Sequence, residues 1–501
     1  MINDQTITGS DFLQLNTREA PAGGLSGWLA DHLRRAIADG RLPVGSRLPA
    51  TRTLAGDLQV SRGVVTEAYR RLTEDGHIAG RGRGGTIVVA APVTPPPAAP
   101  HLAPRPAPVT SLPPTRAALF AGVPTADVFD DLRAAPARID LSPGVPDLTA
   151  FPRAAWLRAE RCVLDDLSSA DFGYGDPRGA PALRLAVANW LARTRGIRVH
   201  PAEVIIVAGV AQALGLIAQV LRADGITAIA IEDPGSLGTR QHLQHWQMDT
   251  PPIPVDSEGL RVEELRATGA AAVLLTPAHQ FPTGVVLDGG RRRELMRWAG
   301  DGGLIIEDDY DAEHRYDRPP VPALRSVLGE HVCYTGSVSK LLAPALRIGW
   351  LLAPPRHFDP LVAAKRYADL GNAMLAQLVL ARLMGNGEIE RQLRYLRRRH
   401  RRRRDAMIAA IGAHLPGAAV HGAAAGLHLM ITFDAVFADT DLAAASLAAG
   451  VKVQPLSWHS QRPERPERPP RPGLVLGYAA STPTDIGEGI ATIGAVLRRL
   501  L

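Results

Sequence analysis

The sequence predicts an α/β protein, in which a mainly parallel sheet forms a large C-terminal domain behind a small N-terminal one. Short apolar runs alternate with helical stretches from about residue 140 onward, which is typical of βαβ units. Ten prolines between residues 92 and 114 separate this part from the residues before it. The chain has 501 residues, 46% hydrophobic and 21% charged, so it can bury a large core.

The composition argues against a membrane-spanning or disulfide-rich protein. No run of roughly eighteen apolar residues occurs, and the N-terminus lacks the basic and apolar regions of a signal peptide. Only Cys162 and Cys333 are present, so we expect reduced thiols, a cytoplasmic location and no membrane partner. A formal net charge of +6 permits nucleic-acid binding without requiring it.

Three helices are predicted at the start of the chain. Apolar residues at helical spacing begin near residue 25, and Gly40 ends this first helix. A short second helix extends to Leu58. Ser61 is the expected N-cap of a third helix that runs to about residue 75. In a helix-turn-helix, the N-terminal residues of that third helix would enter the major groove of DNA.

A β-hairpin is predicted after these helices. Residues 77–79 and 86–89 form two short strands around the tip Arg81-Gly82-Arg83-Gly84-Gly85. Glycine amides and two guanidinium groups at a tip suit contact with phosphates or the minor groove. The hairpin therefore predicts a wing.

These features resemble the GntR family of winged helix-turn-helix regulators over residues 20–90. The matching motifs are Gly45 to Arg52, Val60-Ser61-Arg62 and Glu74-Asp75-Gly76. The resemblance implies a double-stranded DNA operator as partner, with Arg62 as the base reader. The DNA-binding residues that it implies are Arg47, Arg52, Ser61, Arg62, Gly63, Val64, Arg81 and Arg83, of which Arg47, Arg81 and Arg83 would mainly contact phosphates.

Residues 91–137 are predicted to be a linker. Prolines exclude helix and central strand and favour an extended polyproline conformation, which allows the segments on either side to stay apart.

Polar residues follow two predicted strands of the large domain, where parallel sheets bind their ligands. The predicted strands cover residues 204–207, 228–231, 272–275, 304–306 and 332–334. Asp308 and Tyr310 come after the fourth of these strands. Ser337, Ser339 and Lys340 come after the fifth.

These residue types suit pyridoxal phosphate. A lysine can form a Schiff base with an aldehyde, and a carboxylate can keep a pyridine nitrogen protonated. Hydrogen-bond donors and positive charge for a phosphate come from Ser337, Ser339 and Arg347. The segment Gly209-Val210-Ala211 follows the first strand and opens a helix, whose N-terminal amides form an anion site.

The order of these residues resembles fold-type I pyridoxal phosphate enzymes, the aspartate aminotransferase group. The resemblance implies an aminotransferase-like domain over residues 138–501, with a C-terminal small domain from about residue 375. It makes Lys340 the Schiff-base and catalytic residue, Asp308 the partner of the pyridine nitrogen and Tyr310 the partner of the phenolate oxygen. Tyr174 would reach the phosphate of a neighbouring subunit, so a homodimer is implied. The cofactor-binding residues are Lys340, Asp308, Tyr310, Ser337, Ser339, Arg347, Tyr174, Gly209, Val210, Ala211 and His279, and no metal is expected.

The whole chain resembles the MocR subgroup of GntR regulators, with matching segments at residues 232–235, 276–284 and 306–311. Members of that subgroup sense pyridoxal phosphate, sometimes with an amino compound, and regulate genes of vitamin B6 or amino-acid metabolism. We therefore expect a transcription regulator that binds and senses pyridoxal phosphate, with at most residual transaminase activity. The alternative is an active aminotransferase with an accessory DNA-binding head.

Two departures from the aminotransferases concern the substrate side. Residues 473–481 contain no arginine for a substrate carboxylate, although Arg240 or a loop arginine could substitute. Phe281 stands in place of the asparagine of the enzymes' Asn-Pro-Thr-Gly motif, so His279 either takes over a contact with the cofactor ring or is an ordinary packed histidine. We infer that the ligand is the cofactor itself rather than an amino acid.

The densest basic run covers residues 397–404. It is either the solvated face of a long helix or a second DNA contact.

Overall fold

The computed structural model describes residues 24–80, 85–89, 118–311, 313–316, 322–461 and 471–501, together with Leu15, Thr17, Ala20 and Pro21. The chain divides into two compact units, residues 1–111 and 112–501. We call them the head and the body. Arg81 and Arg83 lie outside the described residues, so their predicted contacts stay predictions.

The head is a helix-turn-helix followed by a small antiparallel sheet, as predicted. Its helices are α1 (Leu25–Ala38), α2 (Thr51–Asp57) and α3 (Arg62–Glu74). Its strands, in the order β1-β3-β2, are β1 (Arg47–Leu48), β3 (Thr86–Val88) and β2 (Ile78–Gly80). One apolar core joins the three helices to this sheet, through residues such as Leu33, Leu54, Leu72 and Val88.

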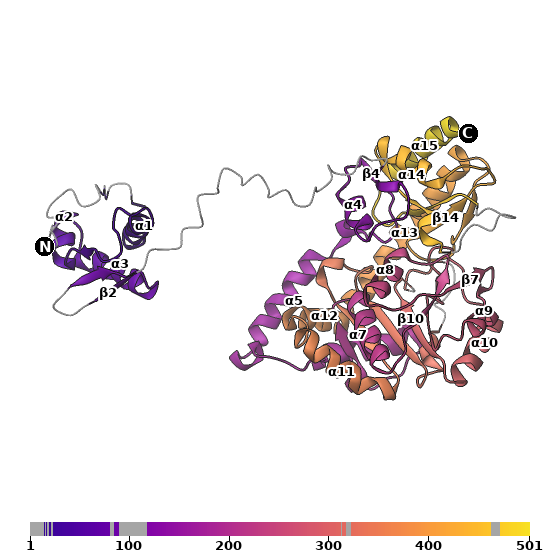
Figure 1. Cartoon of the computed structure of the whole chain (residues 1–501), viewed down its shortest axis with the longest axis horizontal. Coiled ribbons are helices and arrows are strands. Elements are labelled where there is room, and N and C mark those ends of the chain that lie inside the picture. The colour runs from indigo at the N-terminus through magenta and orange to yellow at the C-terminus, as the bar shows by residue number, and fades with distance from the viewer. Residues whose placement is uncertain are drawn as a thin grey trace. The chain divides into compact units, whose positions relative to one another are not determined.

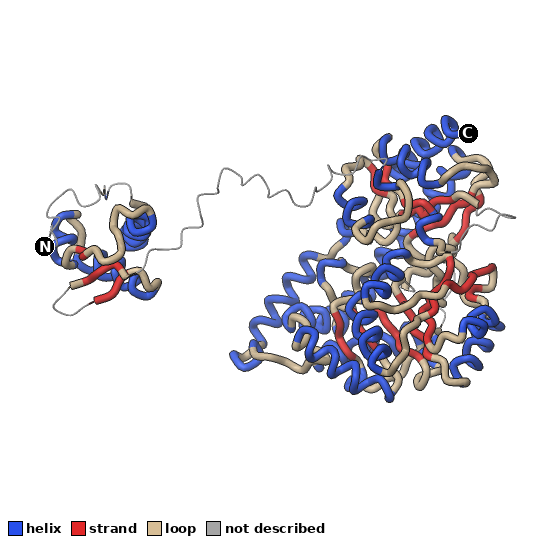
Figure 2. The backbone as a smooth tube through the Cα atoms, in the orientation of Figure 1, coloured by secondary structure: helices blue, strands red, loops and turns tan. Residues whose placement is uncertain are grey.

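An eight-stranded sheet forms the centre of the body (Figure 2), and all five predicted strands belong to it. In spatial order its strands are β5 (Ile205–Val207), β12 (Gly349–Leu352), β11 (Val332–Ser337), β10 (Leu304–Asp309), β9 (Ala272–Leu275), β6 (Ala230–Asp233), β7 (Pro252–Asp256) and β8 (Gly259–Leu260). The neighbours from β11 to β7 run parallel, whereas β12 is antiparallel to both β11 and β5. The sheet is thus mostly parallel.

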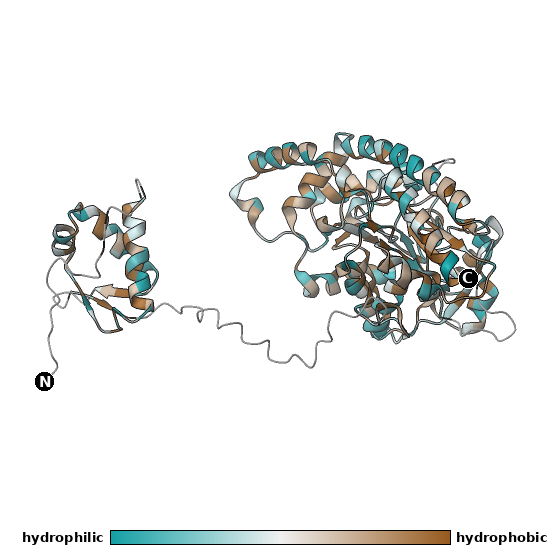
Figure 3. Ribbon diagram, turned by 90° about the horizontal axis from the view of Figure 1, so that it is seen from above, coloured by the Kyte–Doolittle hydropathy of each residue, from teal (hydrophilic) through white to brown (hydrophobic). Residues whose placement is uncertain are grey.

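Helices cover both faces of this sheet (Figure 1). Ile206 and Trp350 pack into one apolar cluster, and Ile205 and Leu351 into another, because successive side chains of a strand point to opposite faces. This is why the strands are apolar throughout their length. Figure 3 shows the same division, with brown strands inside the body and teal on its outer helices.

The first helix of the body, α4, precedes its strands, and the other helices lie between or after them. They are α4 (Val128–Ala134), α5 (Arg153–Asp166), α6 (Pro181–Arg195), α7 (Val210–Ala223), α8 (Leu237–His245), α9 (Val262–Thr268), α10 (Gly289–Gly300), α11 (Pro355–Asp369), α12 (Met374–Gly385), α13 (Glu388–His414), α14 (Asp439–Ala448) and α15 (Pro483–Leu500). Within the described residues, none of the helices is long and apolar enough to cross a membrane.

The C-terminal part of the body has a sheet of its own, with the order β13-β14-β17-β16. These strands are β13 (Ala419–His421), β14 (His428–Thr432), β17 (Gly473–Gly477) and β16 (Gln454–Pro455). The boundary predicted near residue 375 is too early. The apolar face of α12 and the first half of α13, up to Leu396, pack into the core of the large sheet, and only from Met407 do side chains enter the C-terminal core.

The predicted linker is also too long. Residues 91–117 lie outside the described part of the chain, but residues 118–137 belong to the body. Phe120, Val128 and Leu132 are buried in the C-terminal core, and β4 (Ile139–Asp140) pairs with β15 (Val451–Lys452). Burial of these apolar side chains, worth roughly 1.5–3 kcal/mol for each large one, holds the segment against the body.

Candidate functional site

A cavity of about 800 Å³ opens at the carboxyl ends of β6, β9, β10 and β11. Eight of the predicted cofactor-binding residues line it: Val210, Ala211, Asp308, Tyr310, Ser337, Ser339, Lys340 and Arg347. Strand order explains this gathering, because β10 and β11 are parallel neighbours and therefore end side by side. Parts of the chain more than one hundred residues apart thus contribute to one site.

Lys340, which is half-buried, offers a primary amine to this cavity. Its Nζ donates a hydrogen bond to the carbonyl oxygen of Gly144. Burial lowers the pKa of Lys340, and the carboxylates of Asp311 and Asp308 oppose part of that shift. A lower pKa increases the fraction of neutral amine, which is the form that attacks an aldehyde.

Asp308 lies in the same cavity with a strongly perturbed carboxyl group. Burial, and next the neighbouring charge of Asp309, raise the pKa of Asp308 to about 7. The hydroxyl of Thr335 lies 3.4 Å from Asp308 Oδ1 and favours the ionised form. A cationic ring N–H beside this carboxyl group would favour the ionised form much more, so Asp308 suits a pyridinium partner.

Donors and positive charge gather at the N-terminus of α7. Gly209 caps this helix with a φ of +82°, and a Cβ atom there would lie 3.3 Å from Arg347 Nη1. Arg347 donates to the carbonyl oxygen of Ala208, and the amide of Ser339 lies 3.4 Å from Ser337 Oγ. The first amides of α7, two hydroxyl groups and a guanidinium group form a cradle that fits a phosphate.

His279 lies behind Tyr310 and is not among the residues that line the cavity. The Tyr310 hydroxyl donates to the carbonyl oxygen of His279 at 3.2 Å, and His279 Nδ1 lies 2.9 Å from Asp311 Oδ2. These contacts favour a packed histidine over one that contacts the cofactor ring. His428, which the sequence analysis missed, lines the cavity instead. No local signal marks it, because it begins an apolar strand.

Tyr174 is remote from the cavity within one chain. It follows the short helix at Ser169–Phe172, and 94% of its surface is exposed. Other large apolar side chains on α5, α6, α11, α12 and the same loop are exposed as well: Leu157, Leu164, Phe172, Leu185, Tyr367, Leu370 and Leu375. The predicted contact between Tyr174 and a partner's phosphate stays a prediction.

Arg240 is not a replacement for the absent carboxylate-binding arginine. It donates to the carbonyl oxygen of Trp458 at 3.1 Å and does not line the cavity. Besides Lys340 and Arg347, the lysines and arginines that line the cavity are Arg133 and Lys452. Lys452 lies 3.7 Å from Asp140, so a carboxylate already accompanies it.

The described DNA-binding candidates lie on β1 and around the starts of α2 and α3. Arg47, Arg52, Ser61, Arg62 and Gly63 are exposed, whereas Val64 is half-buried and packs against the core of the head. Arg62 Nε lies 3.4 Å from the hydroxyl of Thr51. Ser61 occupies the N-cap of α3 in an extended conformation, although its side chain accepts no capping hydrogen bond.

The basic run lies in the middle of α13 and divides between two environments. Arg398 and Arg402 are exposed, whereas Arg403 and Arg404 are buried. Arg403 donates to Asp147 Oδ2 at 2.8 Å and to the carbonyl oxygen of Ala479. Neither a solvated face nor a DNA contact describes these two inner arginines, which join α13 to other segments of the body.

Family models match the head and the body separately. Residues 138–464 match aminotransferase class I and II, and residues 25–88 match the bacterial regulatory proteins of the gntR family.

Two relatives match nearly the whole chain. The probable rhizopine catabolism regulatory protein MocR of Rhizobium meliloti is 31% identical over 476 residues, covering 93% of this chain and 92% of the relative. The pyridoxine biosynthesis transcriptional regulator PdxR of Corynebacterium glutamicum is 31% identical over 434 residues, covering 86% of this chain and 87% of the relative.

The body also resembles a solved enzyme. The kynurenine aminotransferase of Pyrococcus horikoshii, determined in complex with PMP, superimposes with a TM-score of 0.67 at 25% identity. The match covers 75% of this chain and 94% of the enzyme.

Proposed function

Because the chain belongs to the HTH-type transcriptional regulators that join a gntR-family domain to an aminotransferase class I and II domain, we propose that it senses pyridoxal phosphate. In this proposal the cofactor is held covalently by Lys340, and its binding changes the affinity of the head for a DNA operator. The regulated genes would serve vitamin B6 or amino-acid metabolism. The protein would act as a cytoplasmic homodimer.

The observation that carries the proposal is the cavity, which combines a primary amine, a carboxyl group and a phosphate cradle. Pyridoxal phosphate supplies an aldehyde, a pyridine ring that withdraws electrons and a phosphate. Lys340 would hold the aldehyde carbon, and Asp308 would accept the ring N–H. Ser337, Ser339 and Arg347 would bind the phosphate, with the first amides of α7.

The exposed apolar side chains on α5, α6, α11, α12 and the loop of Tyr174 support the homodimer. Contiguous exposed apolar surface is uncommon on monomeric proteins and commonly marks an interface. Pairing of two bodies through α5, α11 and the loop of Tyr174 would bury this surface. Tyr174 would then be available to the phosphate of the partner.

The absence of an arginine in the described residues 473–481 favours the cofactor over an amino acid as the signal. A buried polar site discriminates ligands through paired charges, and a carboxylate is normally bound by a bidentate arginine. Pyridoxal phosphate can change the affinity for DNA only if it binds more tightly to one of two states of the protein that differ in this affinity.

DNA binding titrated against pyridoxal phosphate and against a panel of amino acids tests the proposal. We expect the cofactor alone to change the affinity of the full-length protein for its operator. A response only to amino acids would contradict it.

An active aminotransferase is the second candidate, because Lys340, Asp308 and Tyr310 share one cavity. Release of keto acid over many turnovers would support catalysis. A single slow half-reaction would not.

A further inference from the structure

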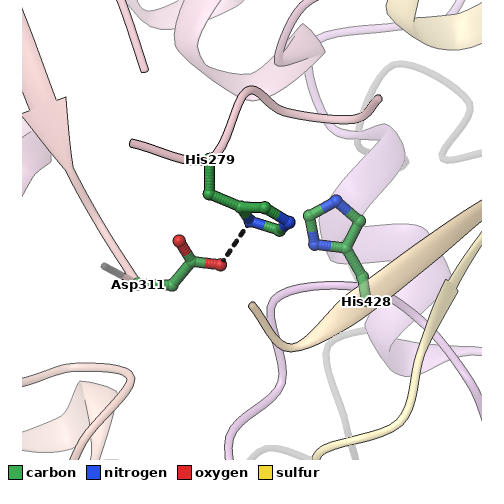
Figure 4. A group of neighbouring side chains, drawn as sticks. All are labelled: His279, Asp311 and His428. Atoms are coloured by element: carbon green, nitrogen blue, oxygen red, sulfur yellow. Dashed lines mark hydrogen bonds and ion pairs between the residues drawn. The ribbon is translucent and has the colours of Figure 1, made fainter. Parts of the chain in front are cut away.

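Two histidines and an aspartate form a buried cluster beside the cavity (Figure 4). Candidate ligand atoms of His279, Asp311 and His428 all lie within 4.8 Å of one another. Each of the three residues is only 2% exposed. They come from separate segments, after β9, after β10 and at the start of β14, and His428 borders the cavity.

Hydrogen bonds determine which nitrogen of each ring carries a proton. His279 Nδ1 lies 2.9 Å from Asp311 Oδ2, and a carboxylate oxygen accepts, so Nδ1 is the donor. The lone pair of His279 is then on Nε2, a buried atom without a hydrogen-bond partner among the described residues. His428 Nε2 lies 3.2 Å from the carbonyl oxygen of Pro282, which can only accept, so the lone pair of His428 is on Nδ1.

The two rings are oriented as metal ligands usually are. A histidine that binds a metal typically donates its other N–H to a carboxylate or a backbone carbonyl group, as these two do. Figure 4 shows His279 between Asp311 and His428, with the two imidazole rings turned toward each other. Their centroids are 5.1 Å apart. A buried nitrogen lone pair that no donor satisfies costs free energy, and an ion between the rings would remove that cost.

We propose that His279 Nε2 and His428 Nδ1 bind a divalent transition-metal ion such as Zn²⁺, with Asp311 and the carbonyl group of Pro282 holding the rings in place. Imidazole ligands favour Zn²⁺, Ni²⁺ and Cu²⁺ over Mg²⁺ and Ca²⁺. Zn–N bonds of about 2.0–2.1 Å place two ligand nitrogens about 3.4 Å apart in a tetrahedral site. The candidate ligand atoms of the cluster lie within 4.8 Å of one another, so binding of one ion would draw the two rings closer together. The remaining positions are left for water or for a ligand in the cavity.

The proposed metal site adjoins the cofactor site, because His428 lines the cavity and His279 contacts Tyr310. Tyr310 Oη lies 3.1 Å from His279 Nδ1, so an ion on this histidine changes the surroundings of a residue assigned to the cofactor. The metal would thus be a second signal beside the cofactor. The site itself does not depend on whether pyridoxal phosphate binds.

Equilibrium dialysis against Co²⁺ tests the site, with the full-length chain carrying no histidine tag and stripped of metal beforehand. The cofactor is left out, since pyridoxal phosphate itself can chelate metals. We expect about one Co²⁺ per chain with ligand-field absorption in the visible range. His279→Asn and His428→Asn should each weaken binding at least about tenfold, and Asp311→Asn by about 10–100-fold.

His421→Asn is the matched control. This half-buried histidine lies on β13, contacts the hydroxyl of Thr432 at 3.0 Å and does not belong to the cluster, so the variant should bind Co²⁺ normally. Circular dichroism checks the folding of each variant. If His279→Asn fails to fold, His428→Asn decides the question. Wild-type protein with less than about 0.1 Co²⁺ per chain, or undiminished binding by His428→Asn, would overturn the proposal.

Discussion

The head and the body use arginine in opposite ways. The head exposes Arg52 and Arg62 at the starts of two helices, whereas the body buries Arg195 and Arg403 against carboxylates. Exposed guanidinium groups remain available to a polyanion, while a buried one must be paired to offset its desolvation. A guanidinium group can therefore bind DNA only where it is exposed, whatever the number of basic residues in the segment. Arg347, which lines the cavity, would have a third role in the proposed function, which is to bind a phosphate.

The largest effect is expected at the cavity. The chain contains only three lysines, Lys340, Lys365 and Lys452. Lys340→Ala should abolish the visible absorbance of lysine-bound pyridoxal phosphate completely, because Lys365 does not line the cavity and Lys452 lies 3.7 Å from the carboxylate of Asp140. Lys452→Ala, which also removes a lysine from the cavity wall, should keep that absorbance and serves as the control. Borohydride reduction followed by peptide mass spectrometry would locate the attachment, and a modified Lys365 or Lys452 would contradict the assignment.

The inner arginines should matter for stability. Arg403→Ala leaves the Asp147 carboxylate, whose side chain is fully buried, with Arg399 as its charged partner among the described residues. We expect the free energy of unfolding to fall by about 2–3 kcal/mol, less than for a pair that loses its only partner. Arg402→Ala, its exposed neighbour on α13, should change it by less than about 0.5 kcal/mol. If urea denaturation gave equal losses in the free energy of unfolding for the two variants, the buried and exposed faces of α13 would not differ in their contribution to stability.

The exposed arginines of the head should matter for DNA. Arg62→Ala should weaken binding to the operator by about 1–3 kcal/mol and leave nonspecific binding nearly unchanged. Arg70→Ala is the control on the same helix, since Arg70 is exposed but already paired with Glu67 and Glu74. Fluorescence anisotropy with specific and random duplexes would measure both. Equal losses on the two duplexes would show that Arg62 contacts phosphates only.

As the pH rises, ionisation of an acidic group should stabilise the head and destabilise the body. Ion pairing with Arg34 lowers the pKa of Asp75 in the head, whereas burial raises the pKa of Asp308 in the body to about 7. A raised pKa means that Asp308 stabilises the cofactor-free body fully below about pH 4, and that this stability is lost as the pH rises through about 7.

The side chain introduced by Asp308→Asn does not titrate. Between about pH 4 and pH 7, the free energy of unfolding of this variant should therefore fall by about 1–2 kcal/mol less than that of the wild-type protein. Glu232 and Glu307 also have pKa values raised to about 7 by burial, but they titrate in both proteins. Chemical denaturation of cofactor-free protein at several pH values would measure the difference. Parallel pH profiles for the two proteins would mean that folding does not raise the pKa of Asp308.

Local patterns in the sequence were enough to predict the elements of the head, five strands of the body and the order of the cofactor residues along the chain. Apolar runs and helical spacing depend on neighbours a few residues away, so the five strands and the three helices of the head could be predicted. Asp308 and Lys340 could be placed in one site, because they follow strands that end at the same edge of a parallel sheet.

The tertiary structure was needed to show which side chains far apart in the sequence contact one another. His428 reaches the cavity from a strand of the C-terminal sheet, Phe120 packs into the body although the prolines suggested a linker, and Arg403 turns inward within a run of identical residues. These positions depend on packing between segments far apart in sequence. A local pattern cannot encode that packing, because the same residue types are equally compatible with a solvated surface.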